Sequence, residues 1–473
     1  MKERCQKIHE GAMRMLERTG MKYHNPKAIE ILKANGIRCE GNVAYFTEEQ
    51  LMFWVRKAPS TFTLYARNPK HNITIGGSNV NPAPLYGCAH IADKNGVKRQ
   101  ATIQDYVNYA KMFHANDDFH VDGGLMVQPF DVPIPSSCLS MFYATYTHSD
   151  KALFCVAGKE EYMDAMLKAG EVAFGGKENM IAHPHMITIV NANTPLQLDV
   201  MMTDVLIKFA EYGQPIIIAP CDMAGSTSPV TVAGTIAMST AEALATIALA
   251  QMVRPGTPVI MGSQSTVADM KTGQIAIGAP EGALCYRYLG QMAKFYQLPA
   301  RAGGALTDSK IVDAQAGMES FMSFLACAQN EVNFIVHSAG ILDGYAYTSY
   351  EKVISDFEVV RYVMRYLKEF EINDDTIPLD LIDEVGHDGE YLTKEHTFMN
   401  CRSELLSPDL CSRGNVEDPA NQYGLNMEKR YAKLMEDYEA KAPELDQDIL
   451  SQIKDILVAQ DIPRELLDSI EKM

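Results

Sequence analysis

The chain has 473 residues, which exceeds one ordinary domain but fits a single large α/β barrel with insertions. Apolar residues make up 47% of it and charged residues 22%, so the chain can bury a full core and is not disordered as a whole. Its formal net charge of −18 excludes a surface-wide field that would attract nucleic acid or anionic lipid, and we expect neither nucleic acid nor a membrane as a partner.

Residues 1–83 are predicted to form an N-terminal segment of helices and hairpins. The apolar spacing up to about Ala58 is helical, and Thr47 is a candidate helix cap. Two β-type stretches follow, FTLYARNPKHNITIGG and APLYGCAHIADKNGVKRQA, and the second contains a hairpin signal at Asn95-Gly96. The first 20 residues are charged and lack the apolar core of a signal peptide, so we expect a cytoplasmic protein.

A unit made of a short apolar run, a polar loop and a helix recurs through residues 84–373. Successive runs begin 30 to 42 residues apart, which is the size of one parallel strand with its crossover helix. Eight such units close into a barrel, and Leu85–Ile91 is the candidate for the eighth. The sequence therefore predicts an α/β fold, a TIM-type (β/α)8 barrel. The other seven runs are His120–Val127, Ala152–Val156, Met186–Val190, Ile216–Ala219, Pro258–Met261, Pro299–Arg301 and Phe334–His337.

Two stretches outside this pattern bear on the fold. Gly234–Val253 is weakly polar but contains Ser, Thr and Glu, so we interpret it as a buried Ala-rich helix and not as a membrane span. Residues 374–473 are acidic, helical and broken by turns. We expect them to form a helical extension packed on the barrel, without a catalytic role of their own.

In a barrel, catalytic groups lie at the carboxyl ends of the strands and in the loops that follow. Here these loops are mostly neutral and offer amide and hydroxyl groups such as those of Asn191, Asn193 and Gln264. The ten cysteines are scattered and no Cys/His set has zinc spacing, so we predict reduced thiols and no metal.

Four groups contain residue types found in catalytic or binding sites, but their positions fit a structural role better. His183-Pro184-His185 precedes its strand and so lies at the wrong end of the barrel. Lys310 lies nine residues past its strand, which makes a Schiff base improbable. Cys221 lacks a local histidine, and Gly225–Ser228 resembles a phosphate loop but has no lysine.

His337 differs from these groups because it ends an apolar run and precedes a loop rich in tyrosine. Tyr345, Tyr347 and Tyr350 follow it, and Tyr86 lies at another probable strand end. Tyrosines at a barrel mouth either pack a lid or form a cage that holds a quaternary ammonium by cation–π attraction. The residues alone leave both readings open.

Several motifs resemble the trimethylamine methyltransferase (MttB) superfamily. They are IHEGAMRMLERTGMKYHNPKAIEILKANG, APSTFTLYARNPKHNITIGG, GGALTDSK, HSAG and TKEHTFMNCRSELLSP, and the likeness extends from about Ile8 to Ala440. The resemblance implies a barrel enzyme that moves a methyl group from an amine to the cobalt(I) of a separate corrinoid protein, with no tightly bound cofactor of its own. The archetype carries pyrrolysine, whereas all 473 residues here are standard. The chain therefore resembles the branch without pyrrolysine, which uses quaternary amines such as glycine betaine, proline betaine and carnitine.

The chemistry of a quaternary amine agrees with that branch. Its nitrogen already carries the positive charge of a leaving group, so no general acid is needed and the protein supplies orientation. The resemblance implies Tyr86, His337 and Tyr345 as pocket positions, and the sequence adds Tyr347. His337, Arg301 or Asn191 would fix the carboxylate of a betaine, with His337 orienting the substrate and not transferring a proton.

Two alternatives stay open at this point. The first is a barrel lyase or aldolase that uses Lys310, and the second is a non-catalytic betaine-binding regulatory subunit. For the favoured methyltransferase we also expect a homo-oligomer.

Overall fold

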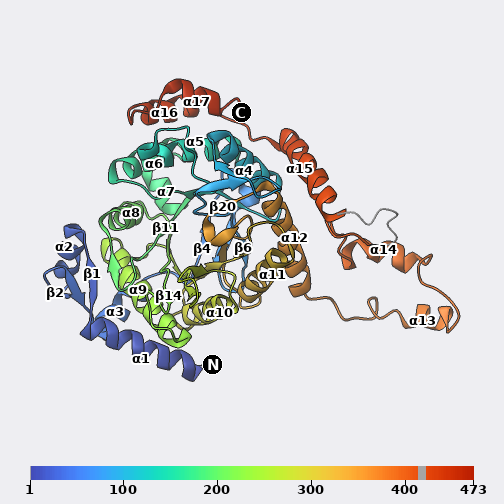
Figure 1. Cartoon of the computed structure of the whole chain (residues 1–473), viewed down its shortest axis with the longest axis horizontal. Coiled ribbons are helices and arrows are strands. Elements are labelled where there is room, and N and C mark those ends of the chain that lie inside the picture. Colours follow the sequence, from blue (N-terminus) through green and yellow to red (C-terminus); the bar gives the residue numbers. More distant parts are fainter. Residues whose placement is uncertain (1, 414–421) are drawn as a thin grey trace.

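The computed structural model describes residues 2–413 and 422–473. Its centre is an eight-stranded parallel sheet rolled into a barrel, with helices around it (Figure 1). This confirms the predicted (β/α)8 fold. The strands are β6 (Asn81–Pro82), β9 (Val121–Gly123), β10 (Ala152–Cys155), β11 (Met186–Val190), β13 (Ile216–Ile218), β15 (Val259–Gly262), β18 (Ala300–Gly303) and β19 (Phe334–Val336).

The strands pair in chain order, and the last strand, β19, pairs with the first, β6. The sheet edges are β6 and β9, so the barrel has a seam between its first and second strands. Just beyond these strands, the Gly87 N–H donates to the Leu125 carbonyl at 2.7 Å and the Gln128 N–H donates to the Cys88 carbonyl at 3.0 Å. The segments that follow the two edge strands therefore bridge the seam.

The first strand differs from our expectation. It lies at Asn81–Pro82, ahead of the run Leu85–Ile91 that we predicted as a strand. The end of that run instead forms β7 (His90–Ala92), which pairs with β8 (Lys98–Gln100) around the predicted Asn95-Gly96 turn and with β20 (Tyr347–Thr348). Strand β6 has only two residues, which pair with β19. A strand this short contains no apolar run, so the sequence pattern could not identify it.

Eight helices follow the eight strands and surround the barrel. They are α4 (Ile103–Ala115), α5 (Ser137–His148), α6 (Glu160–Ala173), α8 (Val200–Glu211), α9 (Val232–Val253), α10 (Pro280–Phe295), α11 (Ala314–Ala328) and α12 (Tyr350–Leu367), with the short α7 (Lys177–Ala182) after α6. Helix α9 is long and apolar enough to cross a membrane, but most of it is buried inside the protein. It packs on β13 and β15 on one side and on α1 and α3 on another, which explains its apolar character on all faces.

The barrel interior is apolar. Val121, Phe154, Ile189, Ile217 and Val336 belong to a buried cluster that also includes Leu64 and Ile75 from the hairpin of β4 (Thr61–Leu64) and β5 (Ile73–Gly76). The Tyr65 N–H donates to the carbonyl of Pro184, just ahead of β11. The hairpin thus closes the amino-terminal end of the barrel and leaves the carboxyl end for a site.

The N-terminal segment is less helical than we predicted. Helices α1 (Lys2–Arg18), α2 (Pro26–Ala34) and α3 (Glu48–Val55) are present, and Thr47 caps α3 as expected. Between them lie β1 (Met21–Tyr23), β2 (Arg38–Glu40) and β3 (Val43–Tyr45). These form a small sheet with β12 (Gln197–Leu198), and a second one joins β14 (Met223–Ala224), β16 (Thr266–Ala268) and β17 (Ile275–Ala276).

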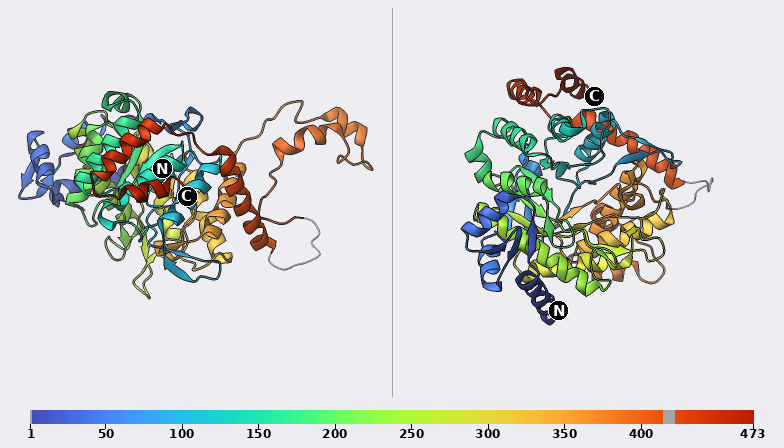
Figure 2. Two further views of the ribbon diagram at one scale, coloured as in Figure 1. Left: turned by 90° about the horizontal axis from the view of Figure 1, so that it is seen from above. Right: turned by 60° about the vertical axis from the view of Figure 1, so that its left-hand side comes forward.

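The C-terminal extension has two parts. Helices α15 (Gln422–Lys441), α16 (Gln447–Val458) and α17 (Arg464–Ile470) pack on the outside of α4, α5, α6 and α12, as predicted. In contrast, α13 (Leu379–Val385) and α14 (Glu395–Glu404) project away from the ring of helices (Figures 1 and 2). The expectation of a fully packed extension was therefore wrong for residues near 370–405. The division of the chain at residues 84 and 374 stays a prediction.

Candidate functional site

Arg301 and His337 meet at the carboxyl ends of neighbouring strands. Arg301 lies within β18 and is 2% exposed, and His337 comes directly after β19 and is 4% exposed. The Arg301 Nη2 lies 3.0 Å from His337 Nε2, and Nη1 donates to the carbonyl of Ser263 at 3.0 Å. Parallel pairing of β18 with β19 brings the two residues together, although 36 residues separate them in the chain.

His337 is held as a neutral imidazole. Burial and the nearby Arg301 charge together lower the pKa of His337 well below its usual range. A neutral imidazole has one acceptor nitrogen, whereas both of its neighbours here, the Arg301 guanidinium and the Tyr86 N–H, are donors that compete for it. The Tyr86 N–H lies 3.2 Å from Nδ1, so the ring is fixed between β18 and the segment after β6.

Two of the predicted tyrosines lie beside this pair. The ring of Tyr345 is edge-on to His337 with centroids 5.2 Å apart, and its hydroxyl is buried without a hydrogen-bond partner in the described chain. Tyr86 lies on top of the apolar barrel core, with its ring 5.1 Å from that of Phe154. Burial raises the pKa of both tyrosines, which keeps both phenols protonated.

The Arg301 guanidinium lacks a carboxylate partner in the described part of the chain. Its neighbours are the phenols of Tyr286 and Tyr345 and the thiols of Cys221 and Cys327. Its Nε is buried and has no hydrogen-bond partner. A buried cation is normally paired, because leaving it unpaired costs several kcal/mol. The unused Nε therefore marks a place for an anionic group that the protein itself does not supply.

A pair of buried carboxyls lies at the same end of the barrel, which the sequence analysis did not identify. Asp222 follows β13, and its Oδ2 accepts from Ser239 and, at 3.2 Å, from Ser265. Glu242 in α9 accepts from the Leu196 N–H at 2.5 Å. Asp222 Oδ1 and Glu242 Oε2 have no hydrogen-bond partner among the described residues.

Burial raises the pKa values of both acids. The pKa of Asp222 rises to about 6 and that of Glu242 rises well above its usual range, and the charge of Asp222 adds to the shift of Glu242. Ser263 links the acids to Arg301, because its carbonyl accepts from the guanidinium and its hydroxyl donates to Ser265 at 2.8 Å. A Glu within the Ala-rich run 234–253 was the available signal for Glu242.

The other predicted site residues lie elsewhere. The Tyr347 hydroxyl donates to the carbonyl of Lys310 at 2.6 Å and its ring faces the Lys98 ammonium at 4.0 Å, so it contacts an outer loop and not His337. Asn191 follows β11, which β13 and β15 separate from β18 in the sheet. The side chain of Lys310 is 64% exposed and pairs with Asp343 at 2.8 Å, away from the barrel interior.

The groups that we interpreted as structural have structural surroundings. His185 stacks on Phe174 with centroids 4.0 Å apart, at the amino-terminal end of β11. Cys221 is half-buried, and its thiol lies 3.7 Å from the carbonyl of Gln264. Within residues 2–413 and 422–473, no three His, Cys, Asp or Glu side chains are grouped so that they could hold a metal ion. That the reaction needs no metal stays a prediction.

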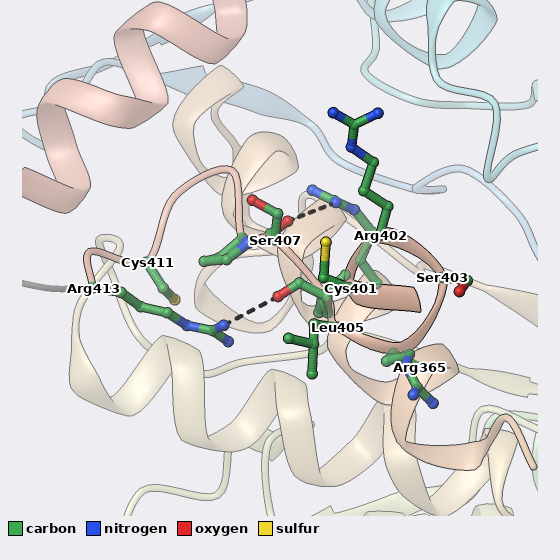
Figure 3. Close-up of a pocket in the computed structure, with 11 residues that line it drawn as sticks. Arg365, Cys401, Arg402, Ser403, Leu405, Ser407, Cys411 and Arg413 are labelled. Carbon is green, nitrogen blue, oxygen red and sulfur yellow. Dashed lines mark hydrogen bonds between the residues drawn. The ribbon is translucent and has the colours of Figure 1, made fainter. Parts of the chain in front are cut away.

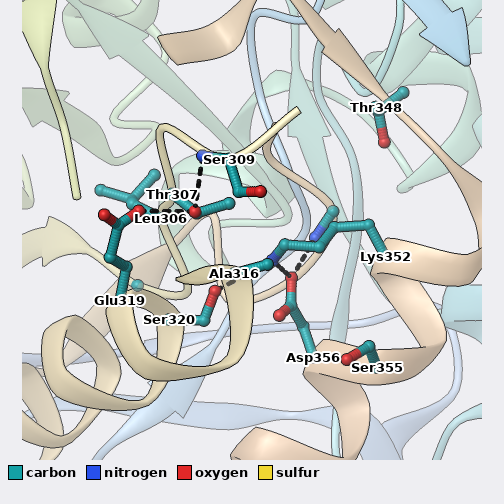
Figure 4. A network of polar contacts seen from close by, with 12 residues as sticks. Leu306, Thr307, Ser309, Ala316, Glu319, Ser320, Thr348, Lys352, Ser355 and Asp356 are labelled. Atoms are coloured by element: carbon teal, nitrogen blue, oxygen red, sulfur yellow. Dashed lines mark hydrogen bonds and ion pairs between the residues drawn. The ribbon is translucent and has the colours of Figure 1, made fainter. Parts of the chain in front are cut away.

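A buried ion pair on α12 supports the loop after His337. Lys352 pairs with Asp356 and donates to Ser320 of α11 at 3.0 Å (Figure 4). Asp356 also accepts from the Gly340 N–H at 2.7 Å. The loop itself holds His337, Asp343 and Tyr345 at φ values of 60°, 49° and 73°, a region that non-glycine residues seldom adopt. Such strain persists only where the surroundings enforce it, and it gathers at functional sites.

A polar cluster at the carboxyl ends of the strands defines this molecule as a barrel of the kind that enzymes use. A sequence profile of the family described as Trimethylamine methyltransferase (MTTB) matches residues 1–461. The chain belongs to this family, as its motifs predicted.

Individual relatives agree with this assignment. A glycine betaine methyltransferase of Desulfitobacterium hafniense (strain Y51) is 40% identical over 420 residues, covering 89% of this chain and 88% of that protein. A proline betaine:corrinoid methyltransferase of Eubacterium limosum is 31% identical and covers 91% of this chain and 90% of that protein. An L-carnitine:corrinoid methyltransferase of the same organism is 29% identical, covering 94% of each chain. A solved hydroxylamine complex of MtmB shares the fold with a TM-score of 0.50, at 10% identity over 92% of this chain and 94% of that one.

Proposed function

We propose that the protein transfers a methyl group from a quaternary amine that also carries a carboxylate, such as glycine betaine, to the cobalt(I) of a corrinoid protein. The observation that carries this proposal is the buried Arg301 guanidinium, whose Nε is unused and which has no carboxylate partner in the described chain. Glycine betaine, proline betaine and carnitine each combine a carboxylate with a quaternary nitrogen, whereas trimethylamine has no carboxylate for this arginine to bind.

The surrounding residues suit the two ends of such a zwitterion. The carboxylate would form a charge-assisted hydrogen bond with Arg301. Tyr86 and Tyr345 flank His337, and the face of either ring would attract a quaternary ammonium by about 0.5 to 2 kcal/mol. His337 would keep the guanidinium in place as a neutral acceptor. The leaving amine departs neutral, so no proton transfer is required of any of these residues.

The same proposal includes the partners and the location. The methyl acceptor would be cob(I)alamin carried by a separate corrinoid protein, with no cofactor bound tightly to this chain. We place the protein in the cytoplasm. Which betaine it uses would depend on the side chains around Arg301, Tyr86 and Tyr345.

The two alternative functions are less well supported. An imine mechanism needs a lysine that faces the barrel interior, but Lys310 is paired with Asp343 at the surface. A regulatory subunit would bind a betaine and never methylate a corrinoid, and nothing in the site favours it over the enzyme.

Calorimetric binding of two ligands tests the role of Arg301. The substitution Arg301→Met should weaken glycine betaine binding by roughly 10- to 150-fold, from the loss of about 1.5 to 3 kcal/mol of charged hydrogen bonding. Binding of tetramethylammonium, which has no carboxylate, should change little. Arg56→Met, at the exposed C-cap of α3, is the matched control. Equal weakening of both ligands, or of neither, would contradict the proposal.

A further inference from the structure

Residues 369–405 form an arm that leaves the barrel after α12. It contains α13 and α14 and lies outside the ring of helices that surrounds the barrel (Figures 1 and 2). The base of the arm is tied to α12, where Arg365 donates to the carbonyl of Glu404 at 2.6 Å and Arg361 donates to that of Ser407 at 3.0 Å. The arm therefore has a fixed root and an outer part with large free surfaces.

The arm is unusually apolar for an exposed segment. Seven of its large apolar side chains are between 65% and 82% exposed. They are Phe370, Ile372, Leu379, Leu392, Phe398, Met399 and Leu405. So many exposed large apolar side chains within one short segment indicate an interaction site, because apolar surface is costly to leave in water.

The arm is also strongly acidic. From Glu369 to Glu390 there are nine Asp and Glu residues and no Lys or Arg. Its surface therefore combines apolar anchors with negative charge, and a partner surface should combine apolar grooves with positive charge.

The pocket of arginines at the root of the arm does not meet that description. It has a volume of about 680 Å³ and is lined by Arg361, Arg365, Arg402 and Arg413 (Figure 3). Arg361 is paired with Asp409 at 2.7 Å, and Arg413 donates to the carbonyl of Leu406 at 3.1 Å. These arginines shape the root of their own arm.

A complementary surface exists on the barrel helices. One groove of about 580 Å³ lies between α10 and α11 and is lined by Leu284, Arg287, Met322 and Leu325 among others. A second of about 340 Å³ lies between α1, α9 and α10, shares Leu284 and includes Arg4 and Lys7. Neither groove has an Asp or Glu among the described residues that line it.

We propose that the arm of one copy docks on these two grooves of a second copy of the same chain, and that the exchange is reciprocal. Helices α10, α11 and α12 lie side by side, so the root of the arm and the groove between α10 and α11 share one flank of the barrel. A twofold axis near that flank lets each arm reach the other copy, as an isologous contact requires.

The character of the surface favours a second copy over a corrinoid protein. A methyl acceptor has to bind and leave in every catalytic cycle, and transient interfaces of this kind are polar. Large apolar surfaces that stay buried belong to permanent assemblies. The preference for a second copy over a corrinoid protein rests on the proposed function, whereas the apolar arm and the grooves do not.

Light scattering on the purified full chain tests the proposal. The wild type should have a mass of at least two chains at micromolar concentration. Leu392→Asp combined with Phe398→Asp, in the arm, should give single chains, and so should Leu284→Asp in the grooves. Met270→Asp is the matched control because Met270 is also 65% exposed but lies in the loop between β16 and β17, and its mass should equal that of the wild type.

Mixing the arm variant with the groove variant sharpens the test. Such a mixture retains one intact arm and one intact groove surface per pair, so it should recover two-chain particles. A monomeric wild type, or arm and groove variants that keep the wild-type mass, would overturn the proposal. So would an arm that becomes covered only when a corrinoid protein is added.

Cross-linking of the unmodified protein keeps the proposal testable if the variants do not fold. A zero-length reagent should join Lys7 to carboxylates of α13 in a species of twice the chain mass. Helix α1, which contains Lys7, and α13 lie apart in one chain (Figure 1), so such a link has to come from a second copy. Its absence from a two-chain species would place the interface elsewhere and refute the docking.

Discussion

At the scale of single residues, the main feature of the site is an arginine that burial and its neighbours leave incompletely satisfied. The Arg301 guanidinium contacts the Ser263 carbonyl and His337, whereas its Nε has no hydrogen-bond partner among the described residues. An unpaired buried charge lowers the stability of the folded protein, and sites that bind charged ligands often retain such a group in spite of this cost. The ligand then recovers the interaction when it binds.

The pH dependence of catalysis tests the role assigned to His337. Because burial and Arg301 keep the pKa of His337 far below 6.5, the imidazole stays neutral from pH 5 to 8. We expect His337→Asn to retain more activity than His337→Ala at every pH, since an amide can still accept from the guanidinium. The logarithm of kcat/KM for the wild type should show no titration near pH 6.5. Equal loss in both variants together with such a titration would indicate proton transfer instead.

The buried acid Asp222 gives a prediction about stability. Its pKa is raised to about 6, above that of an unfolded aspartate, chiefly by burial. Between about pH 4 and 6 the unfolded chain therefore loses this proton first, and native stability falls as pH rises through that window. At pH 8 the native protein therefore carries a buried Asp222 charge, to which no cation among the described residues is paired.

Replacing that acid by its amide should therefore stabilise the protein at high pH. We expect Asp222→Asn to raise Tm at pH 8 and to have little effect at pH 4.5, as measured by thermal unfolding of both proteins in matched buffers. Asp199→Asn, at the half-buried N-cap of α8, serves as a control for a general charge effect, because its amide oxygen can still accept from the Met202 N–H. A variant that is destabilised equally at both values would mean that Asp222 is ionised and paired in the native state.

The sequence placed single residues at strand ends but could not show which chain-distant residues meet, and the role of the predicted site residues stays a prediction. Arg301, His337, Tyr86 and Tyr345 lie together, each at or after a strand end. Tyr347 does not, because pairing of β20 with β7 turns it toward Lys310. The acid pair consists of Asp222 and Glu242, and Glu242 also accepts from the Leu196 N–H. No local sequence pattern predicts that residues so far apart in the chain lie together.

At the scale of elements, α12 positions the loop that carries His337 and Tyr345. The Lys352–Asp356 pair is fully buried and connects α11, α12 and the Gly340 N–H. Removal of one partner leaves a buried charge without its counterion, which costs about 3 to 5 kcal/mol, whereas apolar replacement of both is often neutral.

A double-mutant comparison tests this function of the helix. Asp356→Leu alone should lower the free energy of unfolding by about 3 to 5 kcal/mol in denaturant titrations. The double variant Lys352→Met with Asp356→Leu should recover much of that loss. Additive losses in the double variant would show that the pair contributes packing and not charge compensation.

The length of each strand decides whether the sequence shows it. Seven strands were recognisable because parallel strands buried on both faces are continuous apolar runs. The eighth, Asn81–Pro82, is too short for such a run, and the more apolar stretch after it was mistaken for the strand. The sheet of β1, β2 and β3 was missed because its strands have three residues each and lie between true helices.

At the scale of the whole molecule, the barrel carries the candidate site and the arm carries the proposed contact between copies. The barrel is closed at its amino-terminal end by a hairpin and carries its polar groups at the other end. The arm lies to the side, where it can join copies without covering the site. The sequence predicted the helices of the C-terminal extension but not the projection of α13 and α14, because an acidic helical segment broken by turns does not show which of its helices pack on the barrel.

The central claim is that the protein demethylates a carboxylate-bearing quaternary amine. The most direct test follows the absorption spectrum of cob(I)alamin after addition of the purified protein with glycine betaine, proline betaine, carnitine or trimethylamine. We predict conversion to methylcob(III)alamin with at least one of the three betaines and none with trimethylamine. Equal rates with trimethylamine and the betaines, or no methylation by any quaternary amine, would contradict the account.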